Sequence, residues 1–161
     1  MEEIVFSHYS VLKDEAIAAL NVKENGIYVD CTAGGGGHSL EIVRRLSEKG
    51  RLICIDRDDD ALRACTKRLA GYEDRFVTVK SNFADAAQVL RDMGIEKIDG
   101  ALLDLGVSSY QLDTPERGFS YMNDAPLDMR MDQRQEFTAA DLIAGYSEAE
   151  LARVISDYGE E

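Results

Sequence analysis

The sequence predicts an α/β fold in which a doubly wound, Rossmann-like parallel sheet has helices between its strands. Three observations support this. Short apolar, β-branched runs alternate with segments whose apolar residues recur at helical spacing. The first such run, at 26–29, is followed after four residues by the four glycines Gly34 to Gly37. The second run ends in Asp56, about 20 residues after the glycines, where the doubly wound fold places an acid that accepts from ribose hydroxyls.

The glycine run is expected to be a ligand-binding loop between a strand at 26–29 and a helix at 40–46. Four missing Cβ atoms let the chain turn tightly and let another molecule approach the backbone, next to the start of a helix. A flexible loop is the alternative. Asp56 has an alternative role as the N-cap of the next helix, although Asp58 is better placed for it.

The remaining elements complete a four-stranded pattern. We expect a helix at 11–20, a helix starting in the acids 58–60, a strand at 75–80, a helix ending at Gly94 and a strand at 97–105. The doubly wound rule then orders the strands 3-2-1-4, which leaves 97–105 as an apolar edge. Because an exposed edge invites pairing with another chain, we expect a homodimer through it. The alternative is that helices near the end of the sequence fold back and cover the edge. Four strands are few for this class, so the sheet is interpreted as truncated and the sequence as the front part of a larger enzyme.

The pattern changes after Gly106. Residues 107–132 show neither a helical nor a strand period, and an irregular stretch of this length in a compact domain is usually functional. Two short helices follow, one beginning at Thr138 and one at Ser147, where Glu150 completes a capping box. The expected division is therefore 1–107 for the sheet domain and 108–161 for the irregular segment and the start of a helical insertion.

Composition limits the function classes. The 161 residues are one domain's worth of chain, and the net charge of −13 argues against a nonspecific nucleic-acid binder, though not against an enzyme with a local basic face. No apolar run approaches the roughly 20 residues that span a membrane, and the start lacks the features of a signal peptide. Cys31, Cys54 and Cys65 have no metal-ligand spacing and are interpreted as reduced core residues. We expect a cytoplasmic protein with no membrane association and no metal.

Several blocks of the sequence resemble one family along the whole chain. They are His8 to Leu12, Asp30 to Ser39, Ile55 to Asp58, Asp99 to Asp113, Arg117 to Ser120, Leu127 to Asp132 and Tyr158 to Glu161. These blocks resemble the bacterial RsmH (MraW) family of S-adenosylmethionine-dependent methyltransferases of small-subunit ribosomal RNA. The resemblance implies a methyltransferase fold with a helical insertion, S-adenosyl-L-methionine as cofactor, small-subunit ribosomal RNA as partner, and methylation of a cytidine N4. The sequence ends where that insertion is still running.

The resemblance also implies site residues. The family's cofactor contacts fall on Gly36, Gly37, His38, Asp56, Phe83, Asp104 and Gln111. All except Gln111 lie at or just beyond the carboxyl ends of predicted strands, where open α/β sheets bind ligands. Phe83 either packs on the adenine ring or belongs to the core. His38 is assigned to binding rather than proton transfer, with capping or packing as its alternative.

Asp104 is also the candidate catalytic residue. A cytosine exocyclic amine is a poor nucleophile, so an enzyme must orient it and offer an acceptor to its N–H as charge develops. Asp104 occupies the position where amine methyltransferases place such acceptors, and either role, cofactor contact or amine acceptor, is open. Ser108 and Ser109 are weaker candidates with loop capping as the alternative. Arg117, Arg130 and Arg134 either meet RNA phosphates or pair with nearby acids.

Two other functions are weighed against methyl transfer. A nicotinamide dehydrogenase shares the fold, but the glycine spacing puts Ser39 or Leu40 where its third glycine should stand. A non-catalytic fragment that binds adenosylmethionine, or one that only self-associates, is the alternative from another class.

Overall fold

A computed structural model describes residues 12–159. The chain divides into two units, the first ending at Gly106 and the second beginning at Val107. The predicted helix at 11–20 is present as α1 (Lys13–Leu20). Four residues of the block His8 to Leu12, including Val11 at the predicted helix start, lie outside the described residues, as do Glu160 and Glu161.

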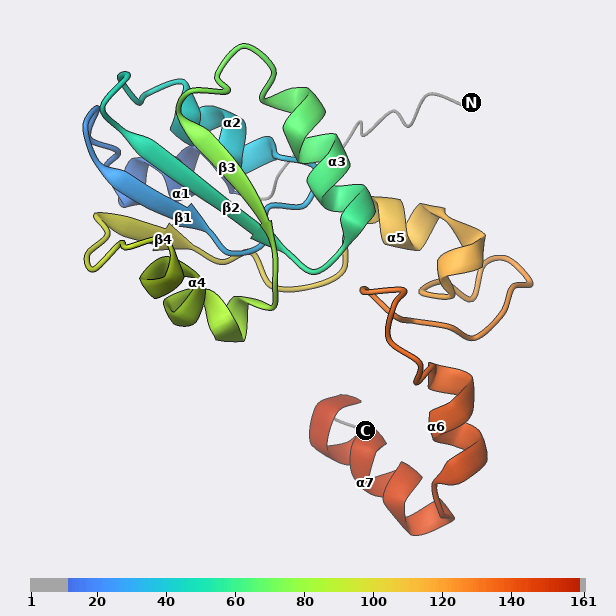
Figure 1. The fold of residues 1–161 in the computed structure, drawn as a ribbon. Helices are drawn as coiled ribbons and strands as arrows, with labels where there is room; N and C mark the ends of the chain where they lie inside the picture. The colour runs from blue at the N-terminus through green and yellow to red at the C-terminus, as the bar shows by residue number, and fades with distance from the viewer. Residues whose placement is uncertain (1–11, 160–161) are drawn as a thin grey trace. The chain divides into compact units, whose positions relative to one another are not determined.

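The first unit is built on a four-stranded parallel sheet in the order β3-β2-β1-β4, as predicted. Its strands are β1 (Ile27–Asp30), β2 (Arg51–Asp56), β3 (Phe76–Lys80) and β4 (Gly100–Leu102). β1 and β2 are almost completely buried, because they lie in the middle of the sheet with helices on both faces (Figure 1). This explains why both strands are continuous apolar runs rather than alternating ones.

Among residues 12–106, the helices α1, α2 (Gly37–Val43) and α3 (Asp59–Arg68) cover one face of the sheet and α4 (Ala86–Asp92) covers the other. α1, α2 and α3 pack with the sheet into one core, to which Ile17, Ile42 and Cys65 each contribute from a different helix. α4 lies beside Val29, Ile53 and Ile55. It follows the short helix η1 (Phe83–Asp85).

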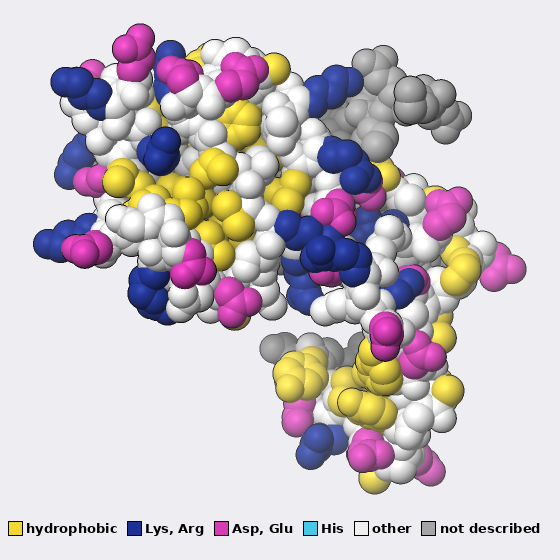
Figure 2. Space-filling model, viewed as in Figure 1, with side chains coloured by type: hydrophobic (Ala, Val, Ile, Leu, Met, Phe, Trp, Pro, Cys, Tyr) yellow, Lys and Arg dark blue, Asp and Glu magenta, His cyan; other side chains and the backbone are white. Residues whose placement is uncertain are grey.

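The α4 face is thinly covered. No residue of α4 or of β3 is fully buried, and Figure 2 shows hydrophobic side chains gathered at the surface on this side of the sheet. All three cysteines are buried and unbridged, as predicted. No helix in residues 12–159 has the length and apolar character to cross a membrane.

Two predicted elements of the first unit need correction. The strand expected at 97–105 is only Gly100–Leu102, because its pairing with β1 ends at Leu102, and Leu103 and Leu105 beyond it are exposed. The helix expected at 40–46 begins earlier, at Gly37 within the glycine run, and ends at Val43.

The second unit is helical. It contains α5 (Ser109–Asp113), the short helix η2 (Pro115–Arg117), α6 (Ala139–Gly145) and α7 (Glu148–Gly159). α5 corrects the expectation that 107–132 is irregular, since five residues are too few to show a helical period. The helix predicted to begin at Thr138 is α6, which begins one residue later because Thr138 is its N-cap. Ser147 and Glu150 form the predicted capping box at the start of α7.

Candidate functional site

The candidate site of the first unit lies where its four parallel strands end. Figure 1 shows the four strand arrows pointing to the same side of the sheet. The glycine loop follows β1, Asp56 ends β2, Phe83 follows β3 and Asp104 follows β4. From β1 the chain runs outward through β2 to β3, and it then crosses to the other side of β1 to form β4, so the strand order reverses at the β1/β4 pair. This pair is the switch point at which open α/β sheets bind ligands.

The glycines of the loop have different structural roles. Gly36 has a φ of 77°, and a Cβ there would lie 3.1 Å from both the Cα of Cys65 and Cδ1 of Leu69. Its missing side chain therefore lets α3 pack closely against the loop. Gly34 has a φ of 49°, but a Cβ there would have nothing nearer than a carbonyl oxygen at 3.8 Å. A Cβ at Gly34 would thus clash with nothing, in contrast to one at Gly36. Contacts of Gly36 and Gly37 with a cofactor stay a prediction.

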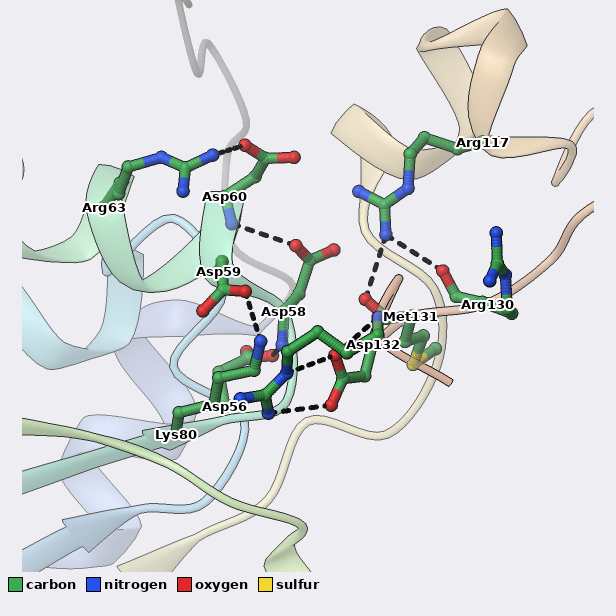
Figure 3. A network of polar contacts seen from close by, with 11 residues as sticks. Asp56, Asp58, Asp59, Asp60, Arg63, Lys80, Arg117, Arg130, Met131 and Asp132 are labelled. Carbon is green, nitrogen blue, oxygen red and sulfur yellow. Dashed lines mark hydrogen bonds and ion pairs between the residues drawn. The ribbon is translucent and has the colours of Figure 1, made fainter. Parts of the chain in front are cut away.

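Asp56 fastens the loop to the end of β2. Its Oδ2 accepts from the Gly34 N–H at 2.8 Å, and its Oδ1 accepts from the Asp58 N–H at 2.9 Å. Burial raises the pKa of Asp56, although these two hydrogen bonds act in the opposite direction. Because a carboxylate offers about four lone-pair sites, Asp56 keeps capacity to accept from a ligand. The role of helix cap falls to Asp58, which accepts from the Asp60 N–H at 3.0 Å (Figure 3).

Asp30 is a residue that sequence reasoning missed. It ends β1 and is completely buried, and its Oδ2 accepts from Oγ of Ser39 at 2.6 Å. Its Oδ1 accepts from the N–H of Thr32 at 3.2 Å. Burial raises the pKa of Asp30. The signal was present in the sequence, because Asp30 stands at the end of its strand as Asp56 does.

Asp104 and His38 lie close together. Nδ1 of His38 is 3.9 Å from Oδ2 of Asp104. The His38 side chain is buried, whereas 47% of the Asp104 side chain is exposed. The backbone N–H of Asp104 donates to the Thr32 hydroxyl at 2.7 Å. The structure therefore brings together two predicted site residues and adds Thr32, which the sequence did not single out.

Phe83 is not a core residue. It is the first residue of η1, and Asn82 caps this turn by accepting from the Ala84 N–H at 3.0 Å. The Phe83 residue is 43% exposed. An exposed ring just after a strand end is available for stacking, whereas the core alternative is wrong.

Gln111 belongs to the second unit and has a structural partner there. Its side-chain oxygen accepts from the Ser108 N–H at 3.0 Å, while the Ser108 hydroxyl accepts from the Gln111 N–H at 3.2 Å. These two bonds form a capping box at the start of α5. The capping alternative is therefore confirmed for Ser108, and a cofactor contact of Gln111 stays a prediction.

Arg130 and Arg134 of the second unit pair with nearby acids. Arg130 donates to Asp128 at 2.6 and 2.8 Å, and Arg134 donates to Asp132 at 3.0 and 3.1 Å. The hydrogen bond from Arg130 lowers the pKa of the Asp128 carboxyl. Alternation of acid and arginine in Leu127 to Asp132 thus forms local ion pairs, and the acid-pairing alternative holds for both arginines.

Arg117 is buried and connects two segments of the second unit. Its guanidinium donates to the carbonyl oxygens of Arg130 and Met131 at 3.1 and 3.0 Å (Figure 3). In return its own carbonyl accepts from the Met129 N–H at 3.0 Å. A Cβ at Gly118 would lie 2.5 Å from the carbonyl oxygen of Pro126, so only glycine fits there. The Arg-Gly pair and the 127–132 block therefore form one structural motif.

Comparison with known proteins decides the family. A model of the MraW methylase family matches residues 5–161. The chain belongs to this family. One MraW relative, the ribosomal RNA small subunit methyltransferase H 2 of Agathobacter rectalis, is 60% identical over 157 residues, which are 97% of this chain and 50% of the relative. The ribosomal RNA small subunit methyltransferase H of Lachnospira eligens is 58% identical over 156 residues, with the same coverage. The chain thus spans about half the length of these curated relatives.

Solved structures agree with the fold. The crystal structure of a proposed rRNA-methylase from Clostridium thermocellum superposes with a TM-score of 0.51 at 24% identity, over 63% of this chain and 54% of that one. At this identity the likeness shows the fold alone. Within residues 12–159 no group of three or more His, Cys, Asp or Glu side chains is arranged to hold a metal ion.

Proposed function

We propose that this member of the MraW family binds S-adenosyl-L-methionine at the β1/β4 switch point, as part of an enzyme that methylates the exocyclic N4 of a cytidine in small-subunit ribosomal RNA. The observation that carries the proposal is the convergence of Asp56, Phe83 and Asp104 on one edge of the sheet, around the glycine loop. The printed names of the relatives, which are ribosomal RNA small subunit methyltransferases, support the choice of substrate.

The residues present fit the cofactor. Asp56 is held rigidly by two backbone N–H groups and retains lone pairs for the two ribose hydroxyls. Phe83 offers an exposed ring for the adenine. Gly34 has no side chain to cover the backbone of the loop, and a Cβ there would clash with nothing, so a ligand can approach the backbone at this residue. Asp56, Phe83 and Gly34 thus provide contacts for the ribose, the adenine and the methionine part of adenosylmethionine, respectively.

Asp104 carries the proposed chemistry. Adenosylmethionine, when bound, would supply an electrophilic methyl group, whose bond to sulfur breaks as the demethylated thioether leaves. The cytidine amine must present its nitrogen lone pair to that group and release a proton as the new N–C bond forms. The Asp104 carboxylate is half exposed, so it can accept from the amine N–H, orient the lone pair and take the proton. We propose Asp104 for this role and for a cofactor contact.

Calorimetry on the 161-residue chain tests the cofactor assignment. Adenosylmethionine and its demethylated product should both bind, because the proposed contacts are to the shared adenosine. NAD should not bind, since the glycine spacing does not fit it. Binding of NAD in place of adenosylmethionine would support the dehydrogenase, and binding of neither would leave only a self-associating fragment.

We also propose that two copies of the chain pair along the edge of β4. β4 is a terminal strand of the sheet, and the exposed Leu103 and Leu105 follow it. Because the carbonyl of Leu102 faces the β1 side and accepts from the N–H of Cys31 just beyond β1, the backbone groups of its neighbour Ala101 face the open edge. Sedimentation should show a dimer at micromolar concentration, and Ala101→Pro should dissociate it by removing an edge donor. A monodisperse monomer of the wild-type chain across this range would contradict the pairing.

The remaining assignments follow from these. We propose that residues 1–107 are the N-terminal part of the cofactor-binding domain and that 108–161 begin a helical insertion.

An enzyme that modifies ribosomal RNA works where ribosomes are assembled, so we propose a cytoplasmic location. Fractionation of cells that express the tagged chain would test this, and recovery outside the cytoplasmic fraction would contradict it.

A further inference from the structure

Beyond the paired residues of β1 and β4, the backbone N–H of Asp104 donates to a side chain instead of a backbone carbonyl. The two strands pair in register from Tyr28 with Gly100 to Asp30 with Leu102, and the Cys31 N–H donates to the Leu102 carbonyl at 2.9 Å. In a continuing parallel ladder the next donor, the Asp104 N–H, would bond the carbonyl of Cys31. It donates instead to the Thr32 hydroxyl at 2.7 Å.

This exchange of partners occurs at the switch point, where β1 and β4 must separate to open a crevice. A backbone acceptor would have kept the two chains at ladder spacing. A side-chain hydroxyl reaches further, so the chain after β4 can diverge and still be held at a defined position. The hydrogen bond to the Thr32 hydroxyl thus holds the chain after β4 to the chain after β1, beyond the last backbone hydrogen bond between them.

Thr32 is itself held in place by the buried Asp30. Its N–H donates to Oδ1 of the buried Asp30, whose other oxygen accepts from Ser39 at the start of α2. His38, the neighbour of Ser39, lies beside the Asp104 carboxylate. These contacts connect α2 with the end of β1, the end of β1 with the end of β4, and the end of β4 with α2 again. Within this network, Thr32 forms the hydrogen bond to the backbone of Asp104.

We infer that Thr32 is a positioning residue, which sets the place of Asp104 at the switch point and through it the affinity of the site for adenosylmethionine. The inference rests on the proposed function for its ligand and goes beyond it in naming the residue that holds the candidate acceptor. The side chain of Thr32 acts on the backbone of Asp104, so it leaves the carboxylate available to the reacting groups.

A double-mutant cycle on the full 161-residue chain tests the inference. The variants are Thr32→Val, which keeps the shape but removes the acceptor, Thr32→Ser, which restores the hydroxyl, Asp104→Ala, and Thr32→Val combined with Asp104→Ala. Thr66→Val is the matched control, since Thr66 donates its hydroxyl proton to the Leu62 carbonyl on α3. The dissociation constant for adenosylmethionine is measured by calorimetry, and amide hydrogen exchange at residue 104 by NMR.

Thr32→Val should weaken binding about tenfold, the equivalent of one hydrogen bond, and should speed exchange of the Asp104 amide. Thr32→Ser and Thr66→Val should bind within about twofold of the wild type. In the Asp104→Ala background Thr32→Val should cost nothing further, because Thr32 acts through Asp104. Fully additive losses, or a Thr32→Ser variant as weak as Thr32→Val, would show a general structural role and overturn the inference.

The two proposals can fail separately. A wild-type chain that does not bind adenosylmethionine contradicts the proposed function and, with it, the effect of Thr32 on affinity. The exchange measurement needs no ligand. Unchanged exchange of the Asp104 amide in Thr32→Val overturns the positioning role whether or not the cofactor binds.

Discussion

Gly36→Ala should destabilise the first unit more than an alanine at another left-handed glycine. The φ of 77° is one that an L-residue adopts at a cost of about 1–2 kcal/mol. The added Cβ would also lie 3.1 Å from the Cα of Cys65 and 3.1 Å from Cδ1 of Leu69. One of these contacts is to backbone, so α3 must shift, and overpacking of this kind costs about 1–3 kcal/mol. The expected loss in free energy of unfolding is about 2–5 kcal/mol.

Gly94→Ala is the matched control. Gly94 has a φ of 71°, and a Cβ there would meet nothing within 4 Å. Gly94→Ala therefore introduces the same kind of backbone strain but no contact with α3, and it should lower the free energy of unfolding by only about 1–2 kcal/mol. The reduced flexibility of the unfolded chain offsets both variants by a similar amount. The difference between the two variants isolates the packing of the loop against α3.

Urea unfolding followed by circular dichroism measures both free energies. Gly36→Ala should unfold at a clearly lower urea concentration than Gly94→Ala, with a similar slope. If the two variants were equally stable, the close approach of α3 to the glycine loop would be wrong, and Gly36 would need another explanation, such as direct contact with a ligand.

Three further predictions concern other parts of the chain. Burial raises the pKa of Asp30, so its contribution to stability is full below the ordinary aspartate pKa of about 3.9 and is lost as pH rises through the raised pKa. In urea titrations, the free energy of unfolding of the wild type minus that of Asp30→Asn should therefore fall over this pH window. A difference that does not change with pH would contradict the burial of this carboxyl group. Arg117→Ala should destabilise the second unit by about 1–3 kcal/mol because it unpairs the carbonyls of Arg130 and Met131, and unchanged amide exchange at Met129 would argue against this. Transfer of labelled methyl groups to small ribosomal subunits lacking the modification should be slower with this chain than with a relative of twice its length, and equal turnover would show that the other half is dispensable.

The sheet was predictable because its signals are local. Buried parallel strands are continuous apolar runs, so the runs that contain Val29 and Ile53 are recognisable, and the order 3-2-1-4 follows from the doubly wound rule. The extent of β4 was not predictable. Leu103 and Leu105 continue the apolar run, but the strand ends where its partner β1 turns into the glycine loop, and that depends on a neighbouring element rather than on its own residues.

The candidate site was predictable in position but not in its connections. The ends of parallel strands converge, so Asp56, Phe83 and Asp104 could be placed on one edge from the sequence. The pairs that fix the site, such as Thr32 with Asp104 and Asp30 with Ser39, join residues 72 and 9 positions apart. No periodicity reports such side-chain contacts. The same holds for Arg117, whose buried contacts with backbone carbonyls replace the phosphate contacts considered for it.

The most direct test of the central claim is the affinity of Asp56 variants for adenosylmethionine, measured by calorimetry. Asp56→Ala should weaken binding by about 1–3 kcal/mol, because a charged acceptor for the ligand is lost. Asp59→Ala is the control, since Asp59 is a neighbouring, half-exposed acid that pairs with Lys80 and should leave the affinity unchanged. A wild-type chain that binds the cofactor with an Asp56→Ala variant of equal affinity would contradict the site at the end of β2.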